Sequence, residues 1–228
     1  MVLGIERFIQ SYPFQPAAKA AGMRYAIFTT KHHDGFNMFN TAYSDFSISK
    51  GPFKTNPRAD VAKYVFEAFR NNDLMVGAYF SKPDWHSEYY WWPRYATPRR
   101  TQNYNIEKNP WRWNQFKEFT YNQISELMHN YGSIDILWLD GGWVNNPGTK
   151  SDMDRISQMA RKAQPGILFV DRTIHGKYEN YQTPEQQIPD KQLPYPWETC
   201  MTLGVDWGYT PHAVFKSPTT VIAKLMEI

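Results

Sequence analysis

An alternation of helix-like and strand-like segments constrains the fold of this chain more than any other feature. Four short runs rich in β-branched and aromatic residues predict strands, at 24–30, 74–80, 133–139 and 166–172. Segments with helical character precede them, at 16–22, 58–72, 113–132 and 151–163, and a further helix is expected over 217–228. Strands that alternate with helices predict a parallel sheet, either a (β/α) barrel or an open doubly wound sheet.

The residues that follow the four strands favour the barrel. The strands finish in "KHHDGF", "SKPDWH", "DGGW" and "DRT", so polar or charged residues stand at all four carboxyl ends. In a barrel these ends form the face on which catalytic groups collect. The doubly wound alternative lacks its main support, because no G-x-G-x-x-G follows the first strand. We therefore expect an α/β fold, a TIM-like (β/α) barrel that residues 1–228 form as a single domain.

The aromatic content indicates the class of ligand. Aromatic residues make up 17% of the 228 residues, including nine Trp and fifteen Tyr, which is more than a core of this size usually needs. Flat aromatic faces suit sugars or nucleic-acid bases. The formal net charge is only +3 and the longest basic run is Arg99-Arg100, which disfavours nucleic acid. The single cysteine excludes an internal disulfide framework and a cysteine-based zinc site. No apolar stretch is long enough to span a membrane, and no secretory signal opens the chain.

The adjacent histidines His32 and His33 have three possible roles. Neighbouring residues on a regular strand point to opposite faces, so both serve one site only if the strand has already ended. The turn signal Asp34-Gly35 would end it there. The pair could ligate a metal, although no further ligands are evident, or it could be structural. We prefer the third role, hydrogen bonding to a hydroxylated ligand.

An aromatic segment over 81–95 follows the second strand. It is too polar and too broken by proline for a core helix. It is either a loop folded on its own aromatic side chains or one wall of a ligand site, because long loops after barrel strands commonly form the binding rim. Trp85 is the first of its aromatic residues.

Asp140 is the strongest candidate for a catalytic group. Alternation along the third strand places Ile136, Trp138 and Asp140 on one face, and an acid on the face of a buried Trp is poorly solvated unless it is hydrogen-bonded or functional. Alone it would be interpreted as a turn residue. Two further acids, Glu185 and Glu198, lie in Pro-rich and aromatic surroundings downstream. Paired carboxylates near aromatic side chains are the requirement for glycoside hydrolysis.

These motifs together resemble those of the glycoside hydrolase family 29 α-L-fucosidases. The similarity runs from about residue 16 to the last residue, through "AKAAGMRYAIFTTKHHDGFNMF", "GAYFSKPDW", "DILWLDGGW", "TPEQ" and "WETCMTLGVDWGY". The resemblance implies a (β/α)-type barrel followed by a β-sandwich, and hydrolysis of terminal α-L-fucosides with retention, without a metal or other cofactor. It also implies a fucosylated oligosaccharide or glycoconjugate as partner, a possible homo-oligomer, and a periplasmic or secreted location.

The resemblance also assigns roles to individual residues. Asp140 would be the nucleophile, and Glu185, ahead of Glu198, the acid/base. His32 and His33 would bind fucose hydroxyls, Tyr79 would line the pocket, Arg172 would lie near the nucleophile, and Trp207 would stack on the apolar side of the sugar. From the aromatic segment over 81–95 we add Trp85 as a substrate-binding residue.

The chain also departs from the family pattern. The "HWG" that ends the family's first strand and the later "GGN…LLN" strand are not found in it. We therefore expect a catalytic domain truncated at both ends. The alternative function is a catalytically impaired fucose-binding remnant; a nucleic-acid binder is a third, weaker alternative.

Overall fold

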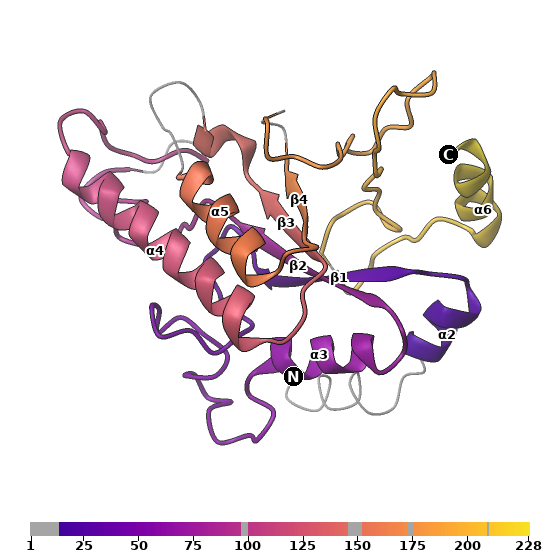
Figure 1. Ribbon diagram of the computed structural model, residues 1–228, viewed down its shortest axis with the longest axis horizontal. Coiled ribbons are helices and arrows are strands. Elements are labelled where there is room, and N and C mark those ends of the chain that lie inside the picture. The colour runs from indigo at the N-terminus through magenta and orange to yellow at the C-terminus, as the bar shows by residue number, and fades with distance from the viewer. Residues whose placement is uncertain (1–13, 97–99, 146–151, 173–175, 209) are drawn as a thin grey trace. The chain divides into compact units, whose positions relative to one another are not determined.

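The computed structural model describes residues 14–96, 100–145, 152–172, 176–208 and 210–228 (Figure 1). Four residues of the predicted elements and motifs lie outside these ranges: Arg99, Ser151 at the predicted start of a helix, Thr173 of "DRT", and Tyr209 of "DWGY". The chain divides into two compact units, Met1–Glu179 and Asn180–Ile228. Among the described residues, no helix is both long and apolar enough to cross a membrane.

The first unit alternates helices and strands, as the sequence predicts. Its helices are α2 (Phe14–Ala20), α3 (Val61–Arg70), α4 (Pro110–Asn130) and α5 (Met153–Ala163), with a short 3-10 helix η1 (Gly142–Asn145). Its strands are β1 (Tyr25–Lys31), β2 (Met75–Ser81), β3 (Ile136–Asp140) and β4 (Leu168–Asp171). Each of these strands overlaps one of the four predicted runs. The strands pair in parallel in the order β1-β2-β3-β4, which is the sequential order of a barrel.

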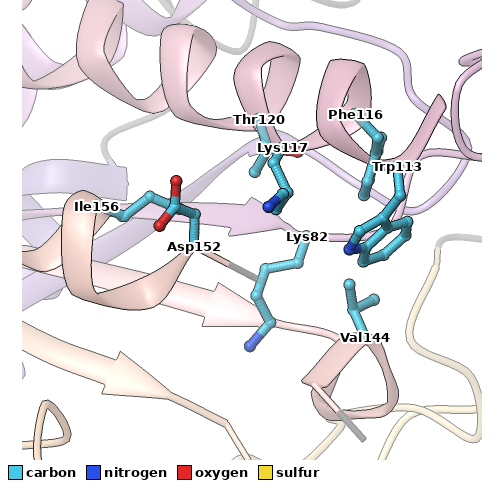
Figure 2. Close-up of a pocket in the computed structure, with 8 residues that line it drawn as sticks. All are labelled: Lys82, Trp113, Phe116, Lys117, Thr120, Val144, Asp152 and Ile156. Atoms are coloured by element: carbon cyan, nitrogen blue, oxygen red, sulfur yellow. The ribbon is translucent and has the colours of Figure 1, made fainter. Parts of the chain in front are cut away.

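The packing of the helices shows which face of the sheet is outside. The main core joins side chains of α3, α4 and α5 to one face of the sheet, which carries Phe80, Leu139 and Phe169. In Figure 1, α4 and α5 lie side by side along the sheet, and side chains of both helices, Thr120 of α4 and Ile156 of α5, line the pocket drawn in Figure 2. Because all three helices cover the same face, the arrangement is that of part of a (β/α) barrel, since a doubly wound sheet has helices on both faces.

The other face of the sheet would be the barrel interior. It carries Tyr79 and Ser81 of β2 together with Trp138 and Asp140 of β3, because successive side chains on a strand alternate. In the parallel register Tyr79 pairs with Trp138 and Ser81 with Asp140. The fold therefore delivers polar side chains to the carboxyl ends of adjacent strands.

The second unit is mostly irregular. Isolated parallel bridges join Gln182 to Trp197 and Glu185 to Cys200. The predicted last helix is confirmed as α6 (Pro218–Glu227), and the Ser217 side chain caps it by accepting a hydrogen bond from the Thr220 N–H (3.1 Å).

Candidate active site

Asp140 ends β3 and is buried, with 8% of its surface exposed. Its Oδ1 accepts a hydrogen bond from the Gly141 N–H (2.7 Å). Gly141 has φ +87°, and a Cβ at this position would stand 2.3 Å from the Pro83 ring. Only glycine satisfies both conditions without strain, so the first glycine of "DGGW" is what allows the chain to turn sharply behind the carboxylate.

Two side chains from neighbouring strands contact the Asp140 carboxylate. The Tyr79 hydroxyl of β2 donates to Oδ2 (2.5 Å), and Arg172 Nη1, directly after β4, lies 3.6 Å from Oδ1. The Arg172 guanidinium also lies over the Trp138 ring, 5.3 Å from its centroid. The carboxylate is thereby held from both sides, and its charge faces a cation that is itself fixed by an aromatic ring.

His33 is buried next to this carboxylate. Its Nε2 lies 3.6 Å from Asp140 Oδ2, and its Nδ1 lies 2.5 Å from Ser81 Oγ. The Ser81 hydroxyl donates to Pro83 O (2.9 Å), so its oxygen is the acceptor for a proton on His33 Nδ1. With the proton on Nδ1, Nε2 is left as a hydrogen-bond acceptor. Burial, followed by the proximity of His32, lowers the pKa of His33 to about 4, so the ring is neutral near pH 7.

His32 lies next to His33 in the same candidate site. Because β1 ends at Lys31, both histidines lie beyond the strand, and the His32 carbonyl accepts the Gly35 N–H of the predicted turn (3.0 Å). The ring centroids of the two histidines are 4.2 Å apart, and the exposed His32 stacks on Tyr79 at 5.9 Å. The strand has therefore ended before the two histidines, which is the condition under which both can serve one site.

The aromatic segment after β2 is partly a core and partly a wall of the site. Tyr90 is fully buried in a second cluster with residues of α4, whereas Trp85 stacks on Trp91 and lies 5.4 Å from the His33 ring. Trp143 of η1 lies 5.0 Å from the same ring. The interpretation as a loop folded on its own aromatic side chains therefore holds for Tyr90, whereas the position of Trp85 beside His33 is compatible with a wall of the site, which stays a prediction.

Ser81 and Trp143 were missed as site residues by sequence reasoning. The alternation along β2 puts Ser81 on the face of Tyr79, which was a usable signal. Trp143 is the last residue of "DGGW" and follows two glycines, after the strand has ended. Strand alternation therefore cannot predict the direction of its side chain.

Three side chains could bring ligand atoms to one cation. Potential ligand atoms of His32, His33 and Asp140 lie within 4.8 Å of one another. The guanidinium of Arg172, 3.6 Å from Asp140, would repel a cation held there. The charges of the site suit a neutral hydroxylated ligand better.

The remaining predicted residues lie in the second unit. Glu198 Oε2 accepts a hydrogen bond from the Tyr181 hydroxyl (3.1 Å), and Glu185 stands opposite Cys200 in a parallel bridge. Trp207 is 60% exposed. The structure thus brings together the six predicted residues of the first unit, and it places the two candidate acid/bases and Trp207 in the second.

Known proteins resemble this chain over nearly its whole length. A family model described as alpha-L-fucosidase matches residues 10–228. The human plasma α-L-fucosidase is 24% identical over 225 residues, covering 94% of this chain and 44% of the relative. The α-L-fucosidase 1 of Arabidopsis thaliana is 32% identical over 159 residues, covering 68% of this chain and 27% of the relative. The chain thus spans less than half the length of these relatives.

Two solved structures share the fold. The α-L-fucosidase isoenzyme 1 of Paenibacillus thiaminolyticus is 33% identical with a TM-score of 0.78, covering 94% of this chain and 53% of that one. The α-L-fucosidase AlfC of Lactobacillus casei, solved with its α-L-fucose product, is 26% identical with a TM-score of 0.72, covering 94% of this chain and 67% of that one.

Proposed function

We propose that this chain, which belongs to the α-L-fucosidase family, is the catalytic part of a retaining exo-α-L-fucosidase that removes terminal α-L-fucose from oligosaccharides or glycoconjugates. The observation that carries this proposal is the buried Asp140 carboxylate, held between Tyr79 and Arg172 beside a neutral His33. AlfC, which is similar to this chain, was solved with fucose as its product. Both units of the chain would contribute to one catalytic domain.

In the first step, Asp140 would attack the anomeric carbon of fucose. The C1–O bond to the leaving group breaks, a bond from C1 to an Asp140 oxygen forms, and the acid/base protonates the departing oxygen. The Gly141 N–H and the Tyr79 hydroxyl each bind one carboxylate oxygen, so they fix the plane of the nucleophile before the sugar enters.

In the second step, water would release the sugar. The acid/base, now deprotonated, removes a proton from water as the water attacks C1, and the bond to Asp140 breaks with overall retention. Glu185 remains our first choice for this role and Glu198 the second. For a retaining enzyme the chosen carboxyl would approach Asp140 to about 5–5.5 Å.

The sugar hydroxyls would be bound by the histidines. His33 Nε2 has a free lone pair when its Nδ1 is protonated, so it accepts a hydrogen bond from a fucose hydroxyl next to Asp140. His32 would bind a second hydroxyl from its exposed position on Tyr79. Trp85 and Trp143 enclose the His33 ring and would line the pocket, and Trp207 would stack on the sugar methyl face.

The decisive experiment measures release of nitrophenol from 4-nitrophenyl α-L-fucoside by the chain and by Asp140→Asn. The chain should turn over and produce α-L-fucose first, as followed by proton NMR, while the variant should bind L-fucose without turnover. If the unaltered chain binds fucose but releases no nitrophenol, it is a fucose-binding remnant and the proposal is wrong.

The two candidate acids can be separated with two substrates. Replacing the acid/base by glutamine should slow hydrolysis of a fucosyl disaccharide far more than that of 4-nitrophenyl fucoside, because nitrophenolate leaves without protonation. Added azide should speed the second step only in that variant. Glu185→Gln is expected to behave this way and Glu198→Gln is its matched control; the reverse result would exchange their roles.

A further inference from the structure

A second concavity lies near the proposed active site but shares none of its predicted residues. It encloses about 390 Å³, which falls in the size range of sites for small ligands. Two loops form most of it, one after β1 and one after β2; its lining includes Tyr43, Ser44, His86, Ser87, Glu88 and Tyr89. Trp85 contacts His33, whereas the residues on either side of Trp85 line this cavity.

The loop after β2 is held in place by a buried ion pair. Lys31 Nζ lies 3.1 Å from Asp84 Oδ2, and both side chains are almost fully buried. Asp84 Oδ1 then accepts the N–H groups of His86 (3.0 Å) and Ser87 (2.8 Å). The His86 ring stacks on Phe46 of the other loop, with centroids 4.2 Å apart and an interplanar angle of 12°. The two walls of the cavity therefore fix each other.

The loop after β1 is held by α4. The Ala42 N–H donates to Glu126 Oε1 (2.8 Å), and the Tyr43 N–H to Thr41 Oγ1 (3.2 Å). Tyr43 itself is 47% exposed. A large aromatic side chain is thus presented to solvent by an anchored backbone, so little ordering is needed when a ligand binds.

The chemistry of the lining suits a neutral sugar. Tyr43 and Tyr89 supply aromatic rings for the C–H face of a pyranose, while Ser44, Ser87 and the exposed Glu88 supply hydroxyl and carboxylate partners for its hydroxyls. Among the described residues that line the cavity there is no Lys or Arg, and the exposed carboxylate of Glu88 would repel a phosphate or another anion.

We infer that this cavity is a second carbohydrate-binding site, which holds neutral, non-fucosylated pyranose units of a glycan and takes no part in hydrolysis. The ligand class rests on the proposed function, because a fucosidase meets such units in every glycan that carries fucose. The site would keep the chain on its substrate while terminal fucose is removed.

The test titrates N-acetyllactosamine, a neutral disaccharide without fucose, into the chain in the presence of saturating L-fucose. Tyr43→Ala should raise the Kd for the disaccharide roughly two- to tenfold, the usual range for loss of one aromatic contact. Tyr43→Phe keeps the ring and should bind like the unaltered chain. Glu88→Ala, on the opposite loop, should also weaken binding. All three variants should hydrolyse 4-nitrophenyl α-L-fucoside at the unaltered rate.

Several results would overturn the inference. These are no binding of N-acetyllactosamine, displacement of the disaccharide by L-fucose, or unchanged affinity in both Tyr43→Ala and Glu88→Ala. Failure of the proposed function is distinguishable, because the disaccharide would then still bind in a Tyr43-dependent way although no fucoside is hydrolysed. If the chain hydrolyses the fucoside but does not bind the disaccharide, only the inference of a second carbohydrate-binding site is wrong.

Discussion

The neutral state of buried His33 predicts how the stability of the chain depends on pH. The pKa of His33 is about 4 in the folded chain, because of burial first and of His32 second, against 6.5 for an unperturbed histidine. Well above pH 6.5 the ring is neutral in both states and contributes almost nothing to the difference. Between pH 6.5 and 4 the unfolded chain binds the extra proton, so the free energy of unfolding falls as the pH falls.

The size of this loss follows from the two pKa values. Their difference corresponds to about 3 kcal/mol when fully developed. His33 keeps 8% of its surface exposed. Solvent screening reduces the effect, and we expect about 2 kcal/mol to be lost between pH 7.5 and pH 4.5.

Urea unfolding at these two pH values measures the loss. His33→Asn removes the titrating ring but keeps an N–H that can donate to Ser81 Oγ, where His33 Nδ1 now lies. Other titrating groups act in both proteins, so they cancel when the pH-dependent losses are compared. The loss should be about 2 kcal/mol smaller in the variant. Equal losses in the two proteins would refute the argument that burial keeps His33 neutral.

Three further predictions concern the site and its support. Tyr79→Phe removes the hydroxyl that donates to Asp140, and kcat/KM for 4-nitrophenyl α-L-fucoside should fall about 10- to 100-fold, since hydrogen bonds to charged groups contribute about 1.5–3 kcal/mol; an unchanged rate would contradict its role. Gly141→Ala should lower the free energy of unfolding by about 2 kcal/mol or more, whereas Gly166→Ala, which has open space, should change it little in the same urea titration. Lys31→Met should cost about 3–5 kcal/mol by leaving Asp84 buried and unpaired, and the double variant with Asp84→Asn should recover part of this loss in thermal unfolding; a double variant no more stable than the single one would contradict the pairing.

The sequence predicts the elements of the first unit well because their signals are local. Each strand is a short apolar run closed by polar residues, and the observed strand β3, Ile136–Asp140, ends on the acid that alternation singled out. The turn at Asp34-Gly35 likewise follows from local chemistry, and it lies directly after the two histidines, whose ring centroids are 4.2 Å apart.

Sequence patterns say less where position depends on packing between distant segments. Trp143 lies in the 3-10 helix η1, and its ring contacts the His33 ring. Its indole N–H donates to Arg100 O (3.1 Å), which holds the ring in this position. No periodicity encodes this contact. Glu185 and Glu198 lie in irregular backbone with isolated bridges, so no alternation assigns a direction to either carboxyl. Their order of preference as acid/base comes from the family resemblance rather than from residue patterns.

The register of β3 explains why a single acid in a hydrophobic strand can be tolerated. Leu137 and Leu139 belong to the core under the helices, whereas Trp138 and Asp140 point to the opposite face. A slip of one residue would exchange the two sets and bury the carboxylate among apolar side chains, at a cost of several kcal/mol. In the observed register the Tyr79 ring stacks on the Trp138 ring, with their centroids 5.2 Å apart. The same packing that fixes the strand therefore presents the proposed nucleophile, so a change of volume at Trp138 should disturb the proposed catalysis as well as stability.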